Sequence, residues 1–379
     1  MADFEARLAR LKDRRQGTSQ MALESLSFDM RRIFELAGVA EDTRQKEFFE
    51  TIAEKKSVQY VIGAMEAVSK KSTDISIEEG ERVAENLISK LKDHNIDCDK
   101  KMQGSVALDV HIKGYSDVDM LIIIKKTLIV EQPALRIGSY MDCDDSRSME
   151  DILKELRLKS EKILCASYPA ANVKKDGNKS IALEGGSLKR KVDIVPSCWF
   201  DSIIYQINKN ENEHERGVKI YLKDKHELDK NFPFKHIKRV NEKDNRYSGN
   251  LKCVVRFLKN IIADIDDDKT QEIAKKLSSY DLTAIAYHMN NELEINIPYF
   301  AQHLDTAYAR LKLVSKTKNF LEFLLENPTV RNSLNVPDDT RKIFDKHEKL
   351  DALKILSYEI SVIEFDITDF LMKHFGSVN

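Results

Sequence analysis

The sequence lacks the features typical of secreted proteins, of membrane-spanning proteins and of proteins with a structural zinc site. No window approaches the ~18 consecutive apolar residues that a membrane span requires. The charged start MADFEARLARLKDRRQ contains no apolar segment of the kind found in signal peptides. The cysteines are scattered and odd in number, and none form a Cys-x-x-Cys pair: Cys98, Cys143, Cys165, Cys198 and Cys253. A disulfide framework and a zinc site are therefore not indicated, and we expect a cytoplasmic protein with reduced thiols.

The sequence also lacks an excess of charge of either sign. Its 61 basic and 63 acidic side chains leave a net charge of −2, so no global field attracts nucleic acid and any basic surface must be local. The 42% of apolar and 33% of charged residues are ordinary for a globular protein. Because 379 residues exceed one compact core of usual size, we expect two domains, or one domain with a large helical extension.

Apolar residues recur at helical spacing near both ends of the chain. A helix is predicted over Glu78–His94, and the chain from Leu251 onward is predicted to be almost wholly helical. Residues 1–95 as a whole are expected to form helices, on the spacing of Phe28, Ile33, Phe34, Leu36, Phe48, Phe49 and Ile52.

The middle of the chain predicts strands around one helix. Met120–Ile124 is a short, β-branched apolar run that favours a buried strand, and Asp151–Ala166 returns to helical spacing. Lys179–Val195 has the pattern of a β-hairpin around the turn-favouring dipeptide Gly185-Gly186. We expect Pro196 to end its second strand.

Two acidic side chains stand at the start of the predicted buried strand. The Asp-x-Asp spacing occurs five times in this sequence, and four of these pairs lie in polar stretches where solvated loop carboxylates are the ordinary interpretation. The pair Asp117 and Asp119 differs because Gly104-Ser105 precedes it by about a dozen residues and the apolar run follows it directly. Since residues i and i+2 of a strand point to the same side, both carboxylates would aim at one spot.

Paired carboxylates of this kind suit a hard divalent cation such as Mg²⁺, which takes oxygen ligands and substrate phosphates. Two such ions ~3.5–4 Å apart can hold the attacking and leaving oxygens of a phosphoryl displacement. Asp193, an isolated acid between Val192 and Ile194, is the third carboxylate that such a site needs. Taken alone, Asp193 is explained equally well by an ion pair with a nearby Lys or Arg; beside the first pair, the metal site is favoured.

Gly104 and Ser105 have their own chemical reason to precede the carboxylates. A glycine lets backbone N–H groups approach a phosphate closely, and a serine hydroxyl adds a donor. We therefore expect Gly104 and Ser105 to contact a phosphate group; the family resemblance described next implies that they cradle the β- and γ-phosphates of a nucleotide.

The ordered set Gly104-Ser105, Asp117-x-Asp119 and the later Asp193 resembles the signature of the DNA-polymerase-β-like nucleotidyltransferase superfamily. Within it, the chain is most similar to the bacterial cGAS/DncV-like nucleotidyltransferases (CD-NTases), by its helical lead-in, the strands GYSDVDMLIII and KVDIVPSCW, and the helical C-terminal half. The resemblance implies an α+β fold: a polymerase-β-like core, with a mixed sheet flanked by helices, a long N-terminal helical lead-in and a helical C-terminal domain. We expect the catalytic domain, with its N-terminal helices, at 1–207 and a helical domain that closes the nucleotide pocket at 208–379.

The C-terminal half adds a finer resemblance. The segments LKCVVRFLKNI and KKLSSYDLTAIAYHM resemble the helix pair in which that branch contacts the nucleotide. By this resemblance, Arg256 and Lys259 would reach triphosphate oxygens from one helix face, three residues apart. Ser279 would donate to phosphate or sugar, and Tyr280 would stack on the donor base. The alternatives are a solvated helix face for the two cations and a core position for Tyr280.

The resemblance also implies an activity: transfer of a nucleotidyl group from an NTP, with ATP among the substrates, to a ribose hydroxyl of a second nucleotide. Asp117 and Asp119 would hold two Mg²⁺ ions, with Mn²⁺ as a substitute, and Asp193 would complete the site of the ion that lowers the hydroxyl pKa. A second round would close a cyclic di- or trinucleotide second messenger, which implies a place in bacterial antiphage (CBASS-type) defence and operon-encoded effector or regulator proteins as partners. Activation by nucleic acid is not expected, because the sequence has no zinc-binding Cys/His insertion and no broad basic surface.

Three other functions stay open on the sequence. The first is another enzyme of the superfamily, a template-independent RNA or tRNA transferase or one that modifies a small molecule. The second is a catalytically silent module that senses nucleotides, against which the complete set of three carboxylates argues. The third is an RNA-binding regulator, which the near-neutral charge disfavours.

Overall fold

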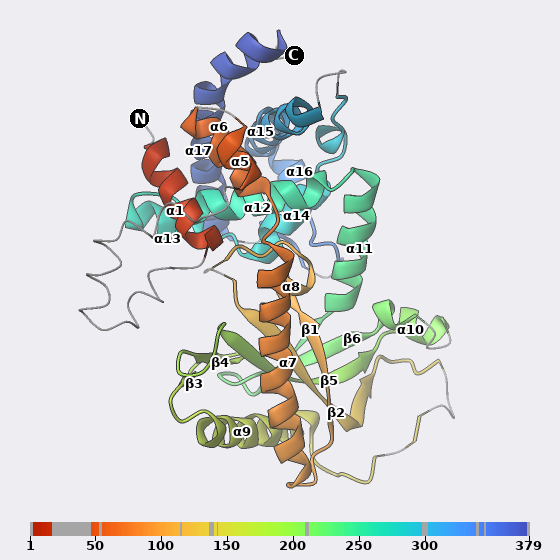
Figure 1. Ribbon diagram of the computed structural model, residues 1–379. Helices are drawn as coiled ribbons and strands as arrows, with labels where there is room; N and C mark the ends of the chain where they lie inside the picture. Colours follow the sequence, from red (N-terminus) through yellow and green to blue (C-terminus); the bar gives the residue numbers. More distant parts are fainter. Residues whose placement is uncertain are drawn as a thin grey trace, which may run out of the picture.

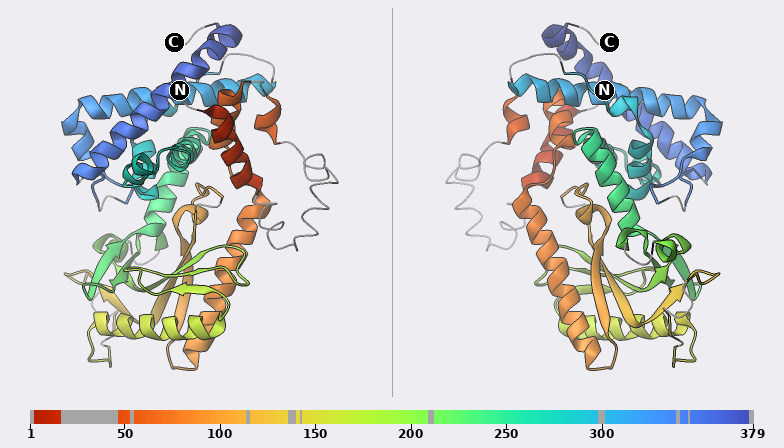
Figure 2. Two further views of the ribbon diagram at one scale, coloured as in Figure 1. Left: turned by 90° about the vertical axis from the view of Figure 1, so that its left-hand side faces the viewer. Right: turned by 90° about the vertical axis from the view of Figure 1, so that its right-hand side faces the viewer.

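The fold has a sheet-containing half and a helical half, joined by two long helices (Figures 1 and 2). The computed structural model describes residues 3–16, 47–52, 55–113, 116–135, 140–141, 143–208, 212–297, 302–338, 341–344 and 346–376. Helix α7 and helix α11 each run from one half into the other, as both views of Figure 2 show. The space between the halves is therefore bordered by a sheet edge on one side and by helices on the other.

A mixed seven-stranded sheet forms the core of the first half. Its strands are β1 Cys98–Gln103, β2 Val118–Val130, β3 Asn172–Lys174, β4 Ile181–Glu184, β5 Val192–Asp201, β6 Gly217–Leu222 and β7 Glu227–Asn231. The central strands β2 and β5 are parallel, β1 pairs with the free edge of β2, and β4 and β6 both pair antiparallel with β5. The predicted strand over Met120–Ile124 is confirmed as the centre of β2.

The continuous apolar run of β2 is explained by burial on both faces of the sheet. Met120 and Ile122 pack with helices α7 and α9 on one face, whereas Leu121 and Ile123 pack with Val218 and other residues of β5 and β6 on the opposite face. A strand covered on both sides has no reason to alternate polar and apolar residues. The predicted helix over Asp151–Ala166 is confirmed as α9.

The predicted hairpin is present, but the expected end of its second strand is wrong. Strands β4 and β5 pair antiparallel around Gly185-Gly186, both of which have positive φ. Strand β5 continues through Pro196 to Asp201. The proline is tolerated because it falls in a gap along one side of β5: β4 pairs only as far as Ile194, and β6 begins to pair at Ser197.

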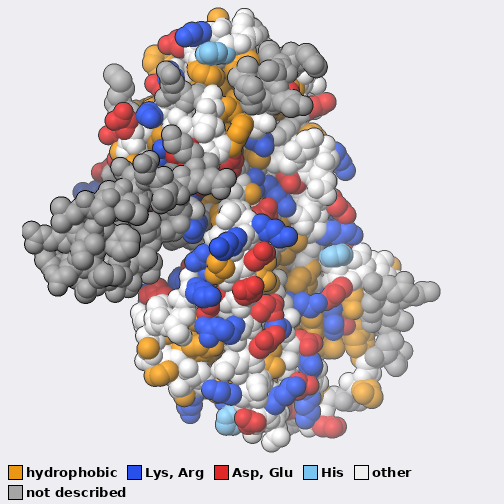
Figure 3. Space-filling model, in the orientation of Figure 1, with side chains coloured by type: hydrophobic (Ala, Val, Ile, Leu, Met, Phe, Trp, Pro, Cys, Tyr) orange, Lys and Arg blue, Asp and Glu red, His pale blue; other side chains and the backbone are white. Residues whose placement is uncertain are grey.

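The helices that cover the sheet or connect it to the second half are α7 Lys70–Lys92, α8 Gly104–Ala107, α9 Met149–Ser167, α10 Ile203–Ile207 and α11 Pro233–Arg246. The helix predicted over Glu78–His94 is confirmed as the second part of α7, whose Val83 and Leu87 face the sheet. On the face seen in Figure 3, Lys and Arg side chains are interspersed with Asp and Glu side chains. Lys100 of β1, for example, forms ion pairs with Glu81 and Glu85 of α7. None of the helices in the described ranges is long and apolar enough to cross a membrane.

The second half is a helical assembly that includes both ends of the chain. Its helices are α1 Phe4–Gln16, α5 Phe48–Thr51, α6 Lys56–Met65, α12 Asn250–Ala263, α13 Asp268–Ala274, α14 Ser279–His288, α15 Gln302–Glu326, α16 Pro328–Ser333 and α17 His347–Phe375. This agrees with the prediction of a helical chain beyond Leu251. The segment with Phe28, Ile33, Phe34 and Leu36 lies outside the described residues, whereas Phe49 of α5 is fully buried.

The first helices share one core with the last ones rather than with the sheet. Leu11 of α1 and Tyr60 of α6 belong to the same apolar cluster as Phe257 of α12. The fully buried carboxylate of Asp264 fixes this arrangement, because it accepts hydrogen bonds from the Arg14 guanidinium (2.5 and 2.6 Å) and from the Tyr60 hydroxyl (2.9 Å). We expected N-terminal helices within a catalytic unit that ends at residue 207. In the structure α1, α5 and α6 pack with the C-terminal helices, α7 packs on the sheet, and the sheet continues through β7 to Asn231, while the division into two domains stays a prediction.

Candidate active site

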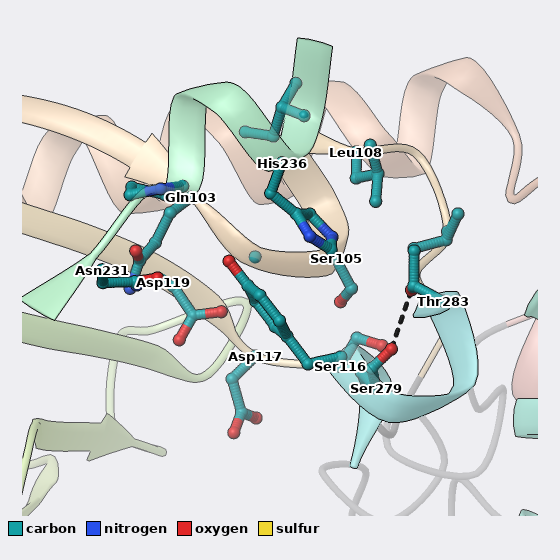
Figure 4. A pocket seen from close by; sticks show the side chains of 15 residues that line it. Gln103, Ser105, Leu108, Ser116, Asp117, Asp119, Asn231, His236, Ser279 and Thr283 are labelled. Atoms are coloured by element: carbon teal, nitrogen blue, oxygen red, sulfur yellow. Dashed lines mark hydrogen bonds between the residues drawn. The ribbon is translucent and has the colours of Figure 1, made fainter. Parts of the chain in front are cut away.

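The register of the parallel strands β2 and β5 brings the expected acidic residues together. Asp119 and Asp193 are direct neighbours in that register, and Val118 pairs with Val192. Asp117 precedes β2 by one residue, on the same side of the strand as Asp119. The ammonium of Lys191 is hydrogen-bonded to Asp117 and lies 4.0 Å from Oδ1 of Asp193. The three carboxylates therefore converge at one end of the two central strands, and Figure 4 shows Asp117 and Asp119 side by side there.

Crowding and burial perturb these acids. Burial, followed by the negative charges of Asp193 and Asp117, raises the pKa of Asp119 to about 7. Burial also raises the pKa of Asp193, and the neighbouring Lys191 opposes that rise. Oδ2 of Asp193 accepts a hydrogen bond from the Ser180 hydroxyl (3.0 Å), but its buried Oδ1 has no hydrogen-bond partner. Such a site favours a bound positive charge, because that charge relieves both the repulsion and the desolvation.

Gly104 fits the site for a steric reason. Its φ is +77°, a backbone conformation that side chains disfavour, and a Cβ there would lie 2.1 Å from Oδ2 of Asp119. Because residue 103 pairs with Asp119 across the β1–β2 ladder, the chain turns away from the sheet directly beside this carboxylate. Only glycine allows so close a passage of the backbone. Ser105 follows it and lines the same pocket.

A pocket of about 340 Å³ adjoins the carboxylates. It is bordered by the end of the sheet, by α8, by the start of α11 and by the start of α14, and its polar lining includes Ser105, Asp117, Asp119, His236, Ser279 and Thr283. Figure 4 shows these side chains around one cavity. A second pocket, of about 440 Å³, shares Gln103, Asn231 and Tyr280 with the first and also contains Lys179, Lys230 and Arg341. The two pockets lie on either side of a common wall.

Tyr280 is part of that common wall. Its ring stacks on His236 (centroids 4.2 Å apart, planes at 27°), and the guanidinium of Arg341 lies 5.3 Å from its centroid. Burial raises the pKa of the Tyr280 phenol. Tyr280 is half-buried and borders both pockets, so it is neither purely a core residue nor an open surface. The base-stacking role expected for it stays a prediction.

Ser279 also lines the first pocket, and the phosphate or sugar contact expected of it stays a prediction. It is the first residue of α14, its side chain lines the first pocket, and its carbonyl accepts a hydrogen bond from the Thr283 hydroxyl (2.7 Å), which is drawn as the dashed line in Figure 4. The preceding residue, Ser278, caps α14 through the backbone N–H of Asp281. Capping by Ser278 leaves the neighbouring Ser279 hydroxyl available to the pocket.

The structure does not bring Arg256 and Lys259 into either pocket. Arg256 donates to the backbone carbonyls of Met65 and Asp109, both at 2.8 Å. Lys259 donates to the Val110 carbonyl and the Ser116 hydroxyl, both at 3.1 Å, and burial lowers its pKa to about 8 despite the acids nearby. Both side chains are buried, so the solvated helix face considered as the alternative is wrong, whereas the triphosphate contacts expected of them stay a prediction. They hold the segment that leads into Asp117 instead of contacting the cavity.

Several residues of the site were missed by the sequence analysis. His236, Asn231 and Thr283 gave no local signal, because they come from elements that meet only in the folded chain. Lys191 did give one: it stands two residues before Asp193, so strand alternation places both side chains on the same side.

The residues present fit a divalent cation. The carboxylate oxygens of Asp117, Asp119 and Asp193 are hard ligands, and the buried Oδ1 of Asp193 lacks a partner. Within the described ranges, no three His, Cys, Asp or Glu side chains already surround one point in the manner of metal ligands. The carboxylate of Asp117 is turned toward Lys191, with which it forms a hydrogen bond. Oxygen donors for a cation are therefore present, and the ammonium group of Lys191 contacts one of them.

Comparisons with known proteins agree with this arrangement. Residues 238–358 match the family model described as the cGAS/DncV-like nucleotidyltransferase C-terminal helical domain. The chain is 37% identical over 367 residues to the cyclic dinucleotide synthase CdnE of Yersinia aleksiciae, covering 95% of this chain and 91% of that protein. It is 31% identical over 331 residues to a c-di-GMP synthase of Lachnospiraceae bacterium (strain RUG226), covering 82% and 88%.

A solved structure supports the same relationship along the whole chain. The STING-associated CdnE c-di-GMP synthase from Capnocytophaga granulosa superimposes with a TM-score of 0.68 at 27% identity, covering 98% of this chain and 100% of that one. The agreement extends over both halves of the fold, including the N-terminal helices that pack with the C-terminal ones. The chain belongs to the cGAS/DncV-like nucleotidyltransferases, a family of nucleotide-transferring enzymes.

Proposed function

We propose that this enzyme joins nucleoside triphosphates into a cyclic dinucleotide or trinucleotide in the pocket between its two halves. The observation that carries the proposal is the register of β2 and β5, which sets Asp119 beside Asp193 with Asp117 next to both, at the edge of a pocket. A relative of 37% identity that matches nearly the whole chain is a cyclic dinucleotide synthase, and this supports the same reaction class here.

In this proposal, Asp117, Asp119 and Asp193 hold two divalent cations, Mg²⁺ or Mn²⁺. When bound, such ions neutralise phosphate charge and lower the pKa of an attacking hydroxyl. The ribose hydroxyl oxygen forms a bond to the α-phosphorus and its proton passes to solvent. The bond between the α-phosphorus and the oxygen that bridges to the β-phosphate breaks, and pyrophosphate leaves with that oxygen and its electron pair. The backbone at Gly104 passes close to Asp119, and the Ser105 hydroxyl donates to the phosphates of the donor nucleotide.

The two adjoining pockets accommodate the two nucleotides that ring closure requires. The first pocket contains the carboxylates and takes the donor, with Tyr280 against its base and Ser279 toward its phosphates or sugar. The second contains Lys230 and Arg341, whose positive charges suit the phosphates of the acceptor, together with Asp338 and with Lys179, which is paired with Asp229 (2.6 Å). Arg256 and Lys259 act indirectly, by fixing the segment before Asp117.

The product would serve as a second messenger in antiphage (CBASS-type) defence, acting on an operon-encoded effector or regulator. This part of the proposal is supported by family membership and by the STING association in the name of the related Capnocytophaga enzyme. Because relatives of 31% identity are c-di-GMP synthases, GTP stands beside ATP as a first substrate to test.

The decisive experiment is incubation of the purified protein with all four labelled NTPs and Mg²⁺ or Mn²⁺, followed by phosphatase and mass analysis. We expect a phosphatase-resistant product whose mass equals that of two or three condensed nucleoside monophosphates without terminal phosphates. Asp119→Asn should abolish it, whereas Asp97→Asn, which alters an exposed Asp-x-Asp pair on the far end of β1, should not. Linear oligonucleotides or extended RNA instead of a ring would show a terminal transferase and contradict the proposal.

A further inference from the structure

Lys191 is the cation that meets the acidic cluster. It stands immediately before β5, and its ammonium is hydrogen-bonded to Asp117 and 4.0 Å from Oδ1 of Asp193. Among the residues that the structure describes, the only ion pairs of Asp117 and Asp193 are with this lysine. Lys259, the other nearby cation, donates to Val110 and Ser116 instead.

The position of Lys191 follows from the sheet. Val118 and Val192 are partners in the parallel register, and the backbone N–H of Val118 donates to the Lys191 carbonyl (3.0 Å), so Lys191 lies beside Asp117 just as Asp193 lies beside Asp119. Alternation along both strands then points all four side chains to one side. The intervening Val118 and Val192 are fully buried in the core on the other side.

The acidic cluster favours a bound positive charge, but the single ammonium of Lys191 does not neutralise or hydrogen-bond all of its carboxylates. One ammonium faces three carboxylates, and the buried Oδ1 of Asp193 still has no hydrogen-bond partner. About a third of each of the Lys191 and Asp117 side chains is exposed, so the pair lies at a solvent-accessible edge. A lysine head on a flexible four-carbon stem can leave such an edge without rearrangement of the backbone.

We propose that the Lys191 ammonium is a built-in stand-in for the divalent cation: it holds the carboxylates together in the metal-free enzyme and is displaced from Asp117 when the ion binds. The inference rests on the proposed function, since it takes the three aspartates as metal ligands. It assigns Lys191 a positioning role with a definite sign, because a residue that competes with the ion makes metal binding weaker, not stronger.

The test is direct Mn²⁺ binding, measured by the loss of the free-ion electron paramagnetic resonance signal, without nucleotide. Lys191→Met removes both the competitor and the positive charge that repels the ion, so the dissociation constant should fall roughly two- to fivefold, the range expected for one partly exposed ion pair. Lys191→Gln should act in the same direction, and Lys191→Arg should bind Mn²⁺ as the parent does. Lys189→Met is the matched control, because this exposed lysine lies two residues earlier and should leave the constant unchanged.

Thermal unfolding supplies an independent readout. Without metal, Lys191→Met should melt below the parent, because its carboxylates repel one another uncompensated, and added Mn²⁺ should raise its melting temperature more than that of the parent. Equal or weaker Mn²⁺ binding by both Lys191→Met and Lys191→Gln would overturn the inference and leave the proposed function standing. If instead the parent and Asp119→Asn bound Mn²⁺ equally, or neither bound it, there would be no metal site at the carboxylates. The proposed function would then fail as well.

Discussion

The sheet side of the pocket, here called the sheet wall, and helix α12 behind the pocket, here called the helical wall, use their charges in opposite ways. On the sheet wall, Asp117, Asp119 and Asp193 crowd around one ammonium, and a buried oxygen is left without a partner. On the helical wall, the two cations of α12 are fully engaged with backbone carbonyls and a hydroxyl. The carboxylates of the sheet wall therefore remain able to bind a positively charged ligand, whereas the cations of the helical wall are already used to hold the backbone in place.

This difference predicts which property each wall controls. Replacing a carboxylate of the sheet wall should remove activity and leave the fold intact, because the acidic cluster is strained by like charges and stabilises little. A change on the helical wall should lower stability first, because it strips partners from buried carbonyl groups. Four experiments test this difference between the two walls.

The largest effect is expected from Asp119→Asn. This variant preserves shape but removes the charge of the most deeply buried acid of the cluster, so product formation should fall by at least about 1,000-fold, or ~4 kcal/mol of transition-state stabilisation. The melting temperature without metal should stay the same or rise, because repulsion with Asp193 is relieved. Initial rates of pyrophosphate release measure the first effect, and thermal unfolding measures the second. If Asp119→Asn unfolded more readily yet retained activity, the sheet wall would control stability rather than catalysis, and the prediction would be wrong.

Gly104→Ala comes next and has a well-matched control. The added Cβ would collide with Oδ2 of Asp119, so we expect a loss of about 100-fold in rate from a misplaced carboxylate. Gly185 has nearly the same φ (+76° against +77°) but no atom within 4 Å of its Cβ position. Gly185→Ala should therefore lose about 1 kcal/mol of stability from backbone strain and keep its rate. Equal rates for the two variants would show that the close passage at Gly104 is not needed.

Arg256→Met tests the helical wall. It leaves the carbonyls of Met65 and Asp109 without their donor, so the free energy of unfolding should fall by about 2–3 kcal/mol in a denaturant titration. Lys252→Met, on the partly exposed side of the same helix, should change stability little. If Arg256 contacted the triphosphate instead, the KM for NTP would rise sharply while stability stayed near that of the parent.

The same difference explains which parts of the site could be predicted from the sequence. The acidic cluster was predictable because it depends on strand alternation and on two short motifs, Asp117-Val118-Asp119 and Lys191-Val192-Asp193, each contained in a few residues. The partners of Arg256 were not, because Met65 and Asp109 lie 191 and 147 residues away and are brought to it only by tertiary packing. A cation on a helix face looks the same in sequence whether it meets a phosphate or a carbonyl.

The outline of the fold shows the same division between local and long-range causes. Strand β2 and helix α9 follow from local patterns, and both were predicted. The passage of β5 through Pro196 depends on where β4 and β6 begin and end beside it. The packing of α1 with α12 depends on the ion pair of Arg14 with Asp264, two residues 250 positions apart. Neither could be read from a window of sequence.

The smallest effect is expected from His111, which lies in the segment that the helical wall holds. Burial lowers its pKa from 6.5 to about 4; Asp109 opposes the shift, whereas the positive charges of Lys259 and Arg256 add to it. The folded protein therefore binds fewer protons than the unfolded chain between pH 6.5 and 4, so stability is full above pH 6.5 and is lost as the pH falls through this range. The free energy of unfolding should drop by about 2 kcal/mol between pH 7 and 5 on account of this group.

His111→Gln should flatten that decline, and the exposed His94→Gln should leave it unchanged. Denaturant titrations at pH 7, 6 and 5 measure all three proteins. Because Lys259 and Arg256 contribute to the shift, Arg256→Met should also weaken the decline, whereas the sheet-wall variant Gly104→Ala should not. An identical pH profile for parent and His111→Gln would mean that neither burial nor the cations of the helical wall shift the pKa of this imidazole, and the contrast between the two walls would then be one of hydrogen bonding alone.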